Sequence, residues 1–311
     1  MIGLRTRRKL LYSLFRQRWN VAVTPYEGTV VAGLLGCRKQ RQALDELQWM
    51  TESADGFAAD PFIAPGSDEK DEYLIFYEYF PWRSRRGQIN CVPVTNAGFG
   101  KSVVSFRSPH HLSYPYTLFH EGGVRVVPEH ATSQNLCMYQ TDRKGYFQGV
   151  DTLAGGLSIV DGTIIHLNDT YWMFGTHLGV GDNVDLYIYH SPKLTGPWIP
   201  HARNPVKSDR SNARPAGHFI RHSGSLFRPA QDCSSHYGAG IVVNEVKTLD
   251  KENFEEDPVC EIRPTVGSHY DYGLHTISSC GDYTAIDGAR LESSLHPSFD
   301  SLSRYLKVPA R

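Results

Sequence analysis

The segment DPFIAPGSDEKDEYLIFYEYF (residues 60–80) carries the pattern that decides the fold. An apolar run begins at Asp60, a polar turn follows it, and a second run rich in aromatic residues begins near Tyr73. Aromatic and β-branched residues favour strands, whereas Gly, Ser and Asp favour turns. The segment therefore predicts a β-hairpin. Asp60 is unexpected at the mouth of a buried strand, and a turn residue is the ordinary explanation for it.

The same layout recurs along the chain. In each copy an apolar strand, a polar or glycine-containing turn and a second strand follow one another. The other four copies are SYPYTLFHEGGVRVVPEH (113–130), VDGTIIHLNDTYWMFGTHL (160–178), RPAGHFIRHSGSLFRPAQDC (214–233) and YGLHTISSCGDYTAIDGARL (272–291). The copies follow one another about every 50 residues, which is a spacing typical of propeller blades.

Further strand candidates lie between the copies, so that each unit can supply the four strands of a blade. They span residues 88–94, 135–140, 184–191 and 240–246. We therefore predict an all-β fold, a five-bladed β-propeller over residues 55–295. A β-sandwich is the alternative, but it does not explain five similar units.

The two ends of the chain lack this pattern. Residues 1–54 are predicted to be an extension that packs on the propeller, and residues 296–311 a C-terminal tail. Leucines at roughly helical spacing among the basic side chains of residues 5–18 indicate a short amphipathic helix. This helix could touch an anionic membrane surface or a partner, or it could simply be solvated. No apolar run reaches transmembrane length, and no signal peptide with a cleavage site is visible.

Composition narrows the class of function. The 311 residues carry a formal net charge of −1, so no overall field attracts nucleic acid. The six cysteines are scattered without a CxxC pair or a Cys/His cluster, and the histidines show no metal spacing, so we expect no metal site. Free thiols favour a reducing compartment, and hence a cytoplasmic location. No nucleotide or flavin motif is present, so we expect no cofactor.

In a propeller, the innermost strand of each blade lines the central channel, and the residues at the strand starts meet at one face. Here these starts carry Asp60, Ser113 or Tyr114, Asp161, Arg214, and Gly273 or His275. Two acids and an arginine converging on one channel mouth indicate a binding or catalytic site.

The sequence resembles known five-bladed enzymes at these positions. ADPFIAP (59–65), YLIFYE (73–78) and SIVDGTIIHLNDTYWMF (158–174) resemble the glycoside hydrolases of families 32, 43, 62 and 68. In family 43 an Asp that opens the first blade acts as the base, and a second Asp in the third blade tunes the pKa of the acid. The resemblance implies these roles for Asp60 and Asp161.

A second resemblance covers most of the chain. HLSYPYTLF, VPEH, LTGPWIPHARNPV, RPAGHFIRHSGSLFRPAQDC, YGAGIVV and HTI, followed by DG, resemble the N-terminal propeller-like domain of plant glucosamine inositolphosphorylceramide transferases. Bacterial proteins that carry this module are similar as well, and some of them are fused to formyltransferase-like domains. The resemblance implies a carbohydrate ligand, which would be a sugar phosphate or another charged sugar if Arg214 binds an anionic group.

The chain departs from family 43 in the fourth blade, where the family has the glutamate that acts as general acid. Arg214 stands there instead, and its guanidinium does not donate a proton at neutral pH. Two compensations are possible. Glu129 in the second blade could reach the channel and serve as the acid, or Arg214 could bind an anionic group of the ligand, such as a phosphate or carboxylate.

Other polar residues have competing interpretations. Glu78, flanked by aromatics, either pairs with an arginine or binds substrate hydroxyls. Tyr114 and His275 are candidate substrate contacts, because sugar rings stack on aromatic side chains. Asp287 in AIDGAR is typical of a turn. We also expect an ion pair between Arg228 and Asp232.

Three functions remain open. The first is a carbohydrate-active enzyme that acts at a glycosidic bond, as a hydrolase or a transferase, with Asp60 and Glu129 as the two carboxyl groups that such chemistry requires. The second is a catalytically inactive sugar-binding propeller that supports a partner transferase. The third is a protein–protein scaffold, which would need a broad apolar face rather than an acidic pocket.

Overall fold

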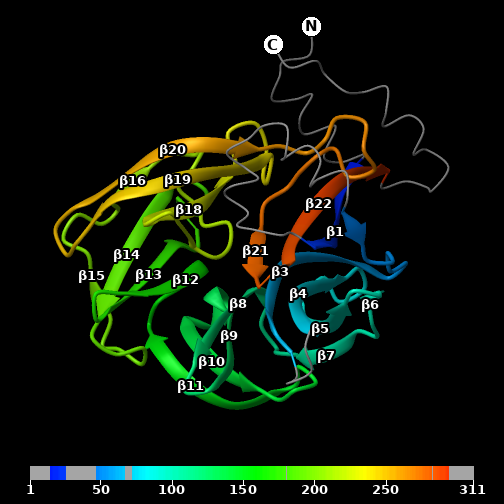
Figure 1. Ribbon diagram of the computed structural model, residues 1–311, viewed down its shortest axis with the longest axis horizontal. Coiled ribbons are helices and arrows are strands. Elements are labelled where there is room, and N and C mark those ends of the chain that lie inside the picture. Colours follow the sequence, from blue (N-terminus) through cyan, green and yellow to red (C-terminus); the bar gives the residue numbers. More distant parts are fainter. Residues whose placement is uncertain (1–14, 26–46, 67–71, 180, 282, 294–311) are drawn as a thin grey trace, which may run out of the picture.

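Five β-sheets surround a common axis in the computed structural model, which describes residues 15–25, 47–66, 72–179, 181–281 and 283–293 (Figure 1). This arrangement confirms the five-bladed β-propeller. No helix among the described residues is long and apolar enough to cross a bilayer. The expected C-terminal tail (296–311) lies outside the described residues.

Blades 1 and 2 are built from consecutive strands in hydrogen-bonded order, with β7 pairing β5 in blade 1. Blade 1 consists of β3 (Gly56–Pro65), β4 (Tyr73–Pro81), β5 (Gln88–Thr95), β6 (Gly98–Phe99) and β7 (Val103–Phe106). Blade 2 consists of β8 (Ser113–His120), β9 (Gly123–Glu129), the 3₁₀ turn η1 (Ala131–Ser133), β10 (Asn135–Thr141) and β11 (Phe147–Gly155).

Blades 3 and 4 follow the same plan. Blade 3 consists of β12 (Ile159–Leu167), β13 (Thr170–His177), β14 (Asp185–Ser191), β15 (Ile199–Pro200) and β16 (Lys207–Ser208). Blade 4 consists of β17 (Ile220–His222), β18 (Ser225–Asp232), β19 (Gly240–Leu249) and β20 (Phe254–Ile262). The segment around Arg214 lies before β17 and joins blade 4 through an isolated bridge between Pro215 and Ala230.

Blade 5 combines the two ends of the chain. Its strand order is β2-β1-β22-β21, from β1 (Phe15–Pro25), β2 (Gln48–Trp49), β21 (Ile277–Cys280) and β22 (Tyr283–Ser293). The helix expected over residues 5–18 is therefore wrong for residues 15–18, which are extended, and residues 5–14 lie outside the described residues. Residues 15–25 and 48–49 are thus integral to the propeller and not an added extension.

Short turns explain why the inner hairpins form where the sequence predicts them. In blade 3 the turn residues Asn168 and Asp169 have φ of 49° and 55°, and in blade 4 Ser223 and Gly224 have φ of 49° and 83°. Two consecutive residues with positive φ make a type I′ turn, whose twist matches that of a two-stranded hairpin. Asn, Asp and Gly tolerate this backbone conformation best, so the local sequence fixes the hairpin register.

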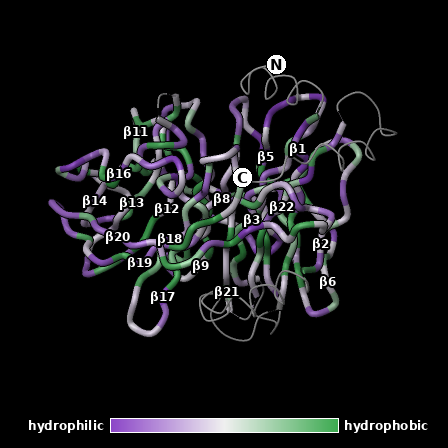
Figure 2. Tube along the Cα trace, turned by 90° about the horizontal axis from the view of Figure 1, so that it is seen from above, coloured by the Kyte–Doolittle hydropathy of each residue, from purple (hydrophilic) through white to green (hydrophobic). Residues whose placement is uncertain are grey.

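Apolar side chains fill the space between neighbouring blades. One buried cluster lies at each of the five junctions, as between blades 3 and 4, where Ile165, Phe174 and Leu186 pack against Ala213. In Figure 2 the apolar residues run through the strands, and hydrophilic residues gather at turns and outer edges. The blades are thus held by burial between sheets, which leaves the axis free for polar side chains.

Candidate active site at the propeller axis

Carboxyl groups connect successive blades at the axis. Asp287 Oδ2 in blade 5 accepts the backbone N–H of Asp60 in blade 1, at 3.1 Å. Asp60 Oδ2 in turn accepts the N–H of Tyr114 in blade 2, at 3.2 Å. Glu129 Oε2 in blade 2 accepts the N–H of Asp161 in blade 3, at 3.3 Å. Three carboxyl side chains therefore link four blades in series at the axis.

The three N–H donors of this series share a backbone conformation. Asp60, Tyr114 and Asp161 have φ of 52°, 41° and 52°, and each lies at a register shift between the first two strands of its blade. Such bulges re-aim side chains. Aspartate tolerates positive φ, but a tyrosine there is unusual, and strained residues of this kind cluster at functional sites.

Asp161 and Arg214 form a buried ion pair between blades 3 and 4. The distance between Arg214 Nε and Asp161 Oδ2 is 2.6 Å, and Gln231 Nε2 donates to the same oxygen at 2.8 Å. Arg214 Nη1 donates to Asn183 Oδ1 at 3.0 Å, and the guanidinium lies 5.1 Å from the centre of the Tyr237 ring. Nη2 makes no hydrogen bond with a described residue, so it is available to a ligand.

Burial alone would lower the pKa of Arg214, but the Asp161 carboxylate outweighs it and raises this pKa well above its ordinary value. The guanidinium therefore stays charged. Arg214 and Gln231 both bind Oδ2 of Asp161, and Oδ1 accepts no hydrogen bond from a described residue. Asp161 is placed to orient Arg214 and Glu129.

Asp60 lies beside a histidine. Its Oδ1 accepts the hydroxyl of Thr276 at 2.8 Å and lies 3.5 Å from His275 Nε2. Asp287 holds this segment, because its Oδ1 accepts the N–H groups of His275 and Thr276 at 2.9 and 3.0 Å. Asp287 Oδ2 lies 2.5 Å from His275 Nδ1, and Trp19 stacks on the imidazole with ring centres 4.0 Å apart.

The carboxyl groups have different pKa values. Burial, opposed by the charge of His275 and reinforced by Asp161, raises the pKa of Asp60 to about 6. Burial, reinforced by Asp161, raises the pKa of Glu129 to about 8. Burial also raises the pKa of Glu78 well above its ordinary value. At neutral pH Asp60 is therefore mostly ionised, whereas Glu129 mostly carries a proton.

Glu78 faces a histidine instead of the arginine that the sequence suggested. Its side chain is 9% exposed, and Oε1 lies 3.5 Å from His111 Nε2. Gly87 makes room for it, since a Cβ there would lie 2.5 Å from this oxygen. Glu78 is adjacent to the other acids and shares in their mutual repulsion.

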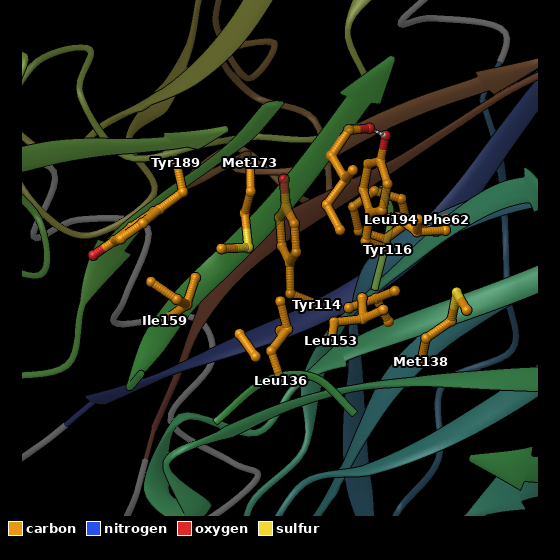
Figure 3. Close-up of a cluster of buried hydrophobic side chains, with 13 residues drawn as sticks. Phe62, Tyr114, Tyr116, Leu136, Met138, Leu153, Ile159, Met173, Tyr189 and Leu194 are labelled. Carbon is orange, nitrogen blue, oxygen red and sulfur yellow. Dashed lines mark hydrogen bonds between the residues drawn. The ribbon is translucent and has the colours of Figure 1, made fainter. Parts of the chain in front are cut away.

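The structure buries the side chains of two expected substrate contacts. Tyr114 is fully buried, and its ring packs edge-on against Phe62 at 4.7 Å, in the cluster between blades 2 and 3 (Figure 3). Its hydroxyl contacts Thr163 Oγ1 at 2.9 Å and accepts the N–H of Gly217 at 2.7 Å. The His275 side chain is only 3% exposed and sits against the acids, so neither ring is open to stack on a sugar.

Three residues of the site were missed or misread. Asp287, interpreted as a turn acid, is completely buried and bonds three backbone N–H groups. Trp19 and Tyr237 were not assigned to the axis at all. The one available signal was the position of Asp287 inside an otherwise apolar run, where an acid needs partners.

The expected ion pair between Arg228 and Asp232 is also wrong. Arg228 Nη2 lies 2.5 Å from Glu256 Oε1, and Asp232 pairs with Arg263 at 2.6 Å. Both pairs stay within blade 4 and take no part in the axial cluster. The arginine of FRP is therefore a structural residue, as expected, but with a different partner.

Asp60, His275 and Asp287 offer ligand atoms within 4.8 Å of one another, which is compatible with a single cation. Both oxygens of each aspartate already accept a hydrogen bond from an N–H or O–H group. The described contacts therefore form a hydrogen-bonded cluster, in which each carboxylate oxygen still has a second lone pair.

The cluster opens to solvent on one side. Glu129, Arg214 and Tyr237 are partly exposed, whereas the other members are buried. A separate hollow of about 650 Å³ lies at the far ends of the inner strands of blades 3 and 4, near Asn168, Arg221 and Lys247. Along the inner strand of blade 3, about six residues separate Asp161 in the axial cluster from Leu167 at the hollow, which is roughly 20 Å. This hollow is therefore distinct from the axial cluster.

The architecture and the cluster define the class of protein: a five-bladed β-propeller with buried acids on its axis. The chain belongs to the family described as glucosamine inositolphosphorylceramide transferase 1, N-terminal, whose model matches residues 46–266.

Curated relatives agree with this assignment. Glucosamine inositolphosphorylceramide transferase 1 of Oryza sativa subsp. japonica is 28% identical over 210 residues, which cover 65% of this chain and 28% of the relative. The Arabidopsis thaliana protein of the same name is 28% identical over 207 residues, which cover 64% and 27%. The chain thus matches little more than a quarter of the length of these relatives.

Solved structures share the fold. The catalytic domain of a family 62 α-L-arabinofuranosidase from Coprinopsis cinerea has a TM-score of 0.55 and 11% identity, with 79% of this chain and 94% of that chain covered. An exo-β-1,3-galactanase from Clostridium thermocellum has a TM-score of 0.52 and 11% identity, with 69% and 54% covered. At these identities the similarity concerns the fold alone.

Proposed function

We propose that this propeller acts at a glycosidic bond of a sugar that carries an anionic group, as a hydrolase or as part of a glycosyltransferase. The observation that carries the proposal is the convergence of Asp60, Glu129, Asp161 and Arg214 from four blades. The names of the family and of the structural relatives are compatible with carbohydrate chemistry, but the activities in those names belong to the relatives.

Glu129 and Asp60 have the protonation states that glycosyl transfer requires. One carboxyl group must give a proton to the leaving oxygen, and the other must accept a proton from the incoming hydroxyl or attack the anomeric carbon. Glu129, with a pKa of about 8, holds a proton at neutral pH, and Asp60, with a pKa of about 6, has lost its own. Two neighbouring acids with separated pKa values suit an acid and a base or nucleophile.

Glu129 and Asp60 also flank one short piece of backbone. Glu129 pairs in register with Ser113, and the next residue, Tyr114, donates its N–H to Asp60. A glycosidic bond held over this backbone would lie between the two carboxyl groups. Glu129 therefore takes the role of the acid that the fourth blade lacks.

Arg214 supplies the affinity for an anion. Asp161 and Asn183 fix Nε and Nη1, which leaves Nη2 to donate to a phosphate or carboxylate oxygen. A guanidinium already held in place loses little side-chain entropy when it binds such a group. The ligand would thus be a sugar phosphate, an acidic sugar or an activated sugar donor.

A second candidate function is a sugar-binding module without catalysis. Its support is the ion pair that ties Arg214 to Asp161, since the position of the family 43 acid is then filled by a structural contact. In this case Asp60 and Glu129 would serve only to bind and to brace the blades.

The test is a screen of neutral oligosaccharides, sugar phosphates and nucleotide sugars against the wild-type protein and the variants Asp60→Asn, Glu129→Gln and Arg214→Lys. Asp151→Asn, on the exposed strand β11, is the matched control. We expect Asp60→Asn and Glu129→Gln to lose turnover by at least about 100-fold while binding persists. If the wild-type protein binds a sugar without turning it over, the result would favour the sugar-binding module without catalysis. If it binds none of the three classes of sugar compound, both candidate functions would be contradicted.

A further inference from the structure

His275 is held from three sides. Asp287 Oδ2 lies 2.5 Å from Nδ1, and Asp287 Oδ1 accepts the backbone N–H of His275. Trp19 lies parallel to the ring, with 22° between the planes. Tyr237 meets the ring edge-on at 5.3 Å. These contacts leave Nε2 facing Asp60 Oδ1, at 3.5 Å.

The indole that fixes the histidine is itself closely fitted. A Cβ at Gly238 would lie 2.7 Å from the Trp19 ring, and one at Gly273 would lie 3.0 Å from it. Gly238 has φ of 66°, so a side chain there would also be strained. The fold thus builds a slot for Trp19, and Trp19 fixes the plane of His275.

We propose that His275, held by Asp287 and Trp19, is a positioning residue that places a cationic ring beside Asp60 and keeps this carboxylate ionised and aimed into the site. This inference rests on the proposed function, because Asp60 is the base or nucleophile there. It replaces the substrate contact that the sequence suggested for His275.

The charges around the pair make such a cation necessary. Acidic side chains from three other blades and from blade 1 itself interact electrostatically with Asp60, and so do two tyrosine phenols. These groups are Asp287 on β22, Asp161 on β12, Glu129 on β9, Glu78 on β4, Tyr114 on β8 and Tyr237 before β19. A buried carboxylate among acids would take up a proton unless a nearby positive charge opposed it.

The shift of the His275 pKa agrees with a cationic ring. Burial alone would lower this pKa, but the charges of Asp287 and Asp60 outweigh burial and raise it above the ordinary value. Arg214, the other cation of the site, is committed to Asp161 at 2.6 Å. His275 is therefore the cation assigned to Asp60 among the described residues.

The test measures ionisation and needs no substrate. Aspartate carboxyl carbons are labelled with ¹³C, the Asp60 signal is identified by its loss in Asp60→Asn, and its pKa is followed by NMR between pH 4 and 9. We expect His275→Gln to raise the Asp60 pKa by about one unit or more, since an opposite charge within a few ångströms shifts a carboxyl by about 1–3 units.

His218→Gln is the matched control. His218 is partly buried between Thr117 and Ser278, but burial lowers its pKa to about 4, so it carries no charge at neutral pH. We expect this variant to leave the Asp60 pKa unchanged. An equal shift in both variants would overturn the proposal, because it would reflect repacking and not charge.

A second measurement keeps the proposal testable if His275→Gln does not fold. In the unmodified protein, ¹⁵N spectra of the His275 ring should show both nitrogens protonated at pH 7. A neutral ring at this pH would overturn the proposal. Saturable shifts of the ring signals on addition of Ca²⁺ would overturn it as well, in favour of a metal site.

The outcome is separable from that of the proposed function. If turnover is found, the acidic limb of its pH profile should move upward in His275→Gln by the same amount as the Asp60 pKa. If no sugar is turned over but the Asp60 pKa moves as expected, the proposed catalysis fails while the role of His275 stands. If Asp60 is shown to be catalytic but its pKa is unchanged in His275→Gln, only the role proposed for His275 is contradicted.

Discussion

Asp60 in blade 1 accepts the backbone N–H of Tyr114 in blade 2, and this one bond joins a candidate catalytic carboxylate to the frame of the propeller. The same type of bond joins Asp287 to Asp60 and Glu129 to Asp161. The residues proposed for catalysis therefore also connect neighbouring blades by hydrogen bonds. Their substitution should change stability in ways that can be told apart from changes in activity.

Asp60→Ala should destabilise the fold more than Asp60→Asn. Alanine leaves the N–H of Tyr114 and the hydroxyl of Thr276 without an acceptor, whereas the amide oxygen of asparagine can still accept one of them. A buried donor without a partner costs about 1–3 kcal/mol. Urea unfolding of both variants measures the difference. Equal stability of the two variants would show that the bond to Tyr114 contributes nothing.

Arg214→Met should cost about 3–5 kcal/mol of stability, because it leaves the buried Asp161 carboxylate without its cation. The matched control is Arg263→Met. Arg263 pairs with Asp232 at the same distance of 2.6 Å, but its side chain is 42% exposed, so we expect a loss below about 1 kcal/mol. Adding Asp161→Asn to Arg214→Met should recover part of the loss. Losses of similar size in the two single variants would contradict the buried ion pair.

Glu52 should make the protein sensitive to acid. Burial raises its pKa, but bonds from Arg290 and Tyr270 and the charge of Arg18 outweigh it and lower the pKa from 4.5 to about 2. A carboxyl group with a lowered pKa in the folded state stabilises the fold above pH 4.5, and this contribution disappears as the pH falls toward 2. The melting temperature should therefore fall less between pH 6 and 3 in Glu52→Gln than in the wild type.

Glu129 should act in the opposite direction. Because its folded-state pKa is raised from 4.5 to about 8, the folded protein keeps a proton that the unfolded chain releases, and stability declines as the pH rises through this range. Glu129→Gln removes this decline. Melting temperatures are measured at pH 5, 7 and 9. The melting temperature of Glu129→Gln should be close to that of the wild type at pH 5 and higher than that of the wild type at pH 9. A variant that follows the wild type at every pH would refute the raised pKa.

Gly217→Ala should open the junction between blades 4 and 5. Gly217 has φ of 125°, and a Cβ there would lie 1.7 Å from the carbonyl oxygen of Ile277. Gly224→Ala is the matched control, with φ of 83° and open space around the added carbon. We expect a loss of about 1 kcal/mol for the control, from backbone strain, and at least about twice that for Gly217→Ala. Thermal unfolding compares them.

The sequence predicts the hairpins and the gathering of Asp60, Asp161 and Arg214, because turn residues and strand patterns act locally and the repeat places them in equivalent positions. Glu129 also reaches the cluster, which is one of the two alternatives that the sequence leaves open. These features depend on neighbours within about 20 residues or on the symmetry of the fold.

The errors concern partners that are distant in sequence. Arg16 and Arg18 suggested the polar face of a helix, but in the structure both pair with Glu292 on the last strand. Asp287 suggested a turn because its bonding partners belong to another blade or to a separate segment. Tyr114 suggested a sugar contact, but the bulge turns its ring into the core. Charge and polarity indicate that a partner exists without specifying which one.

The eleven paired residues between β1 and β22 close the ring with the two ends of the chain. A fragment trimmed to residues 46–266, the limits of the family match, would lose both of these strands together with His275 and Asp287. Such a fragment would retain Asp60, Glu129, Asp161 and Arg214, but without blade 5 it would expose the apolar faces of blades 4 and 1 that pack against that blade. Any minimal version of the module used in the laboratory must therefore begin no later than Phe15 and continue to Ser293.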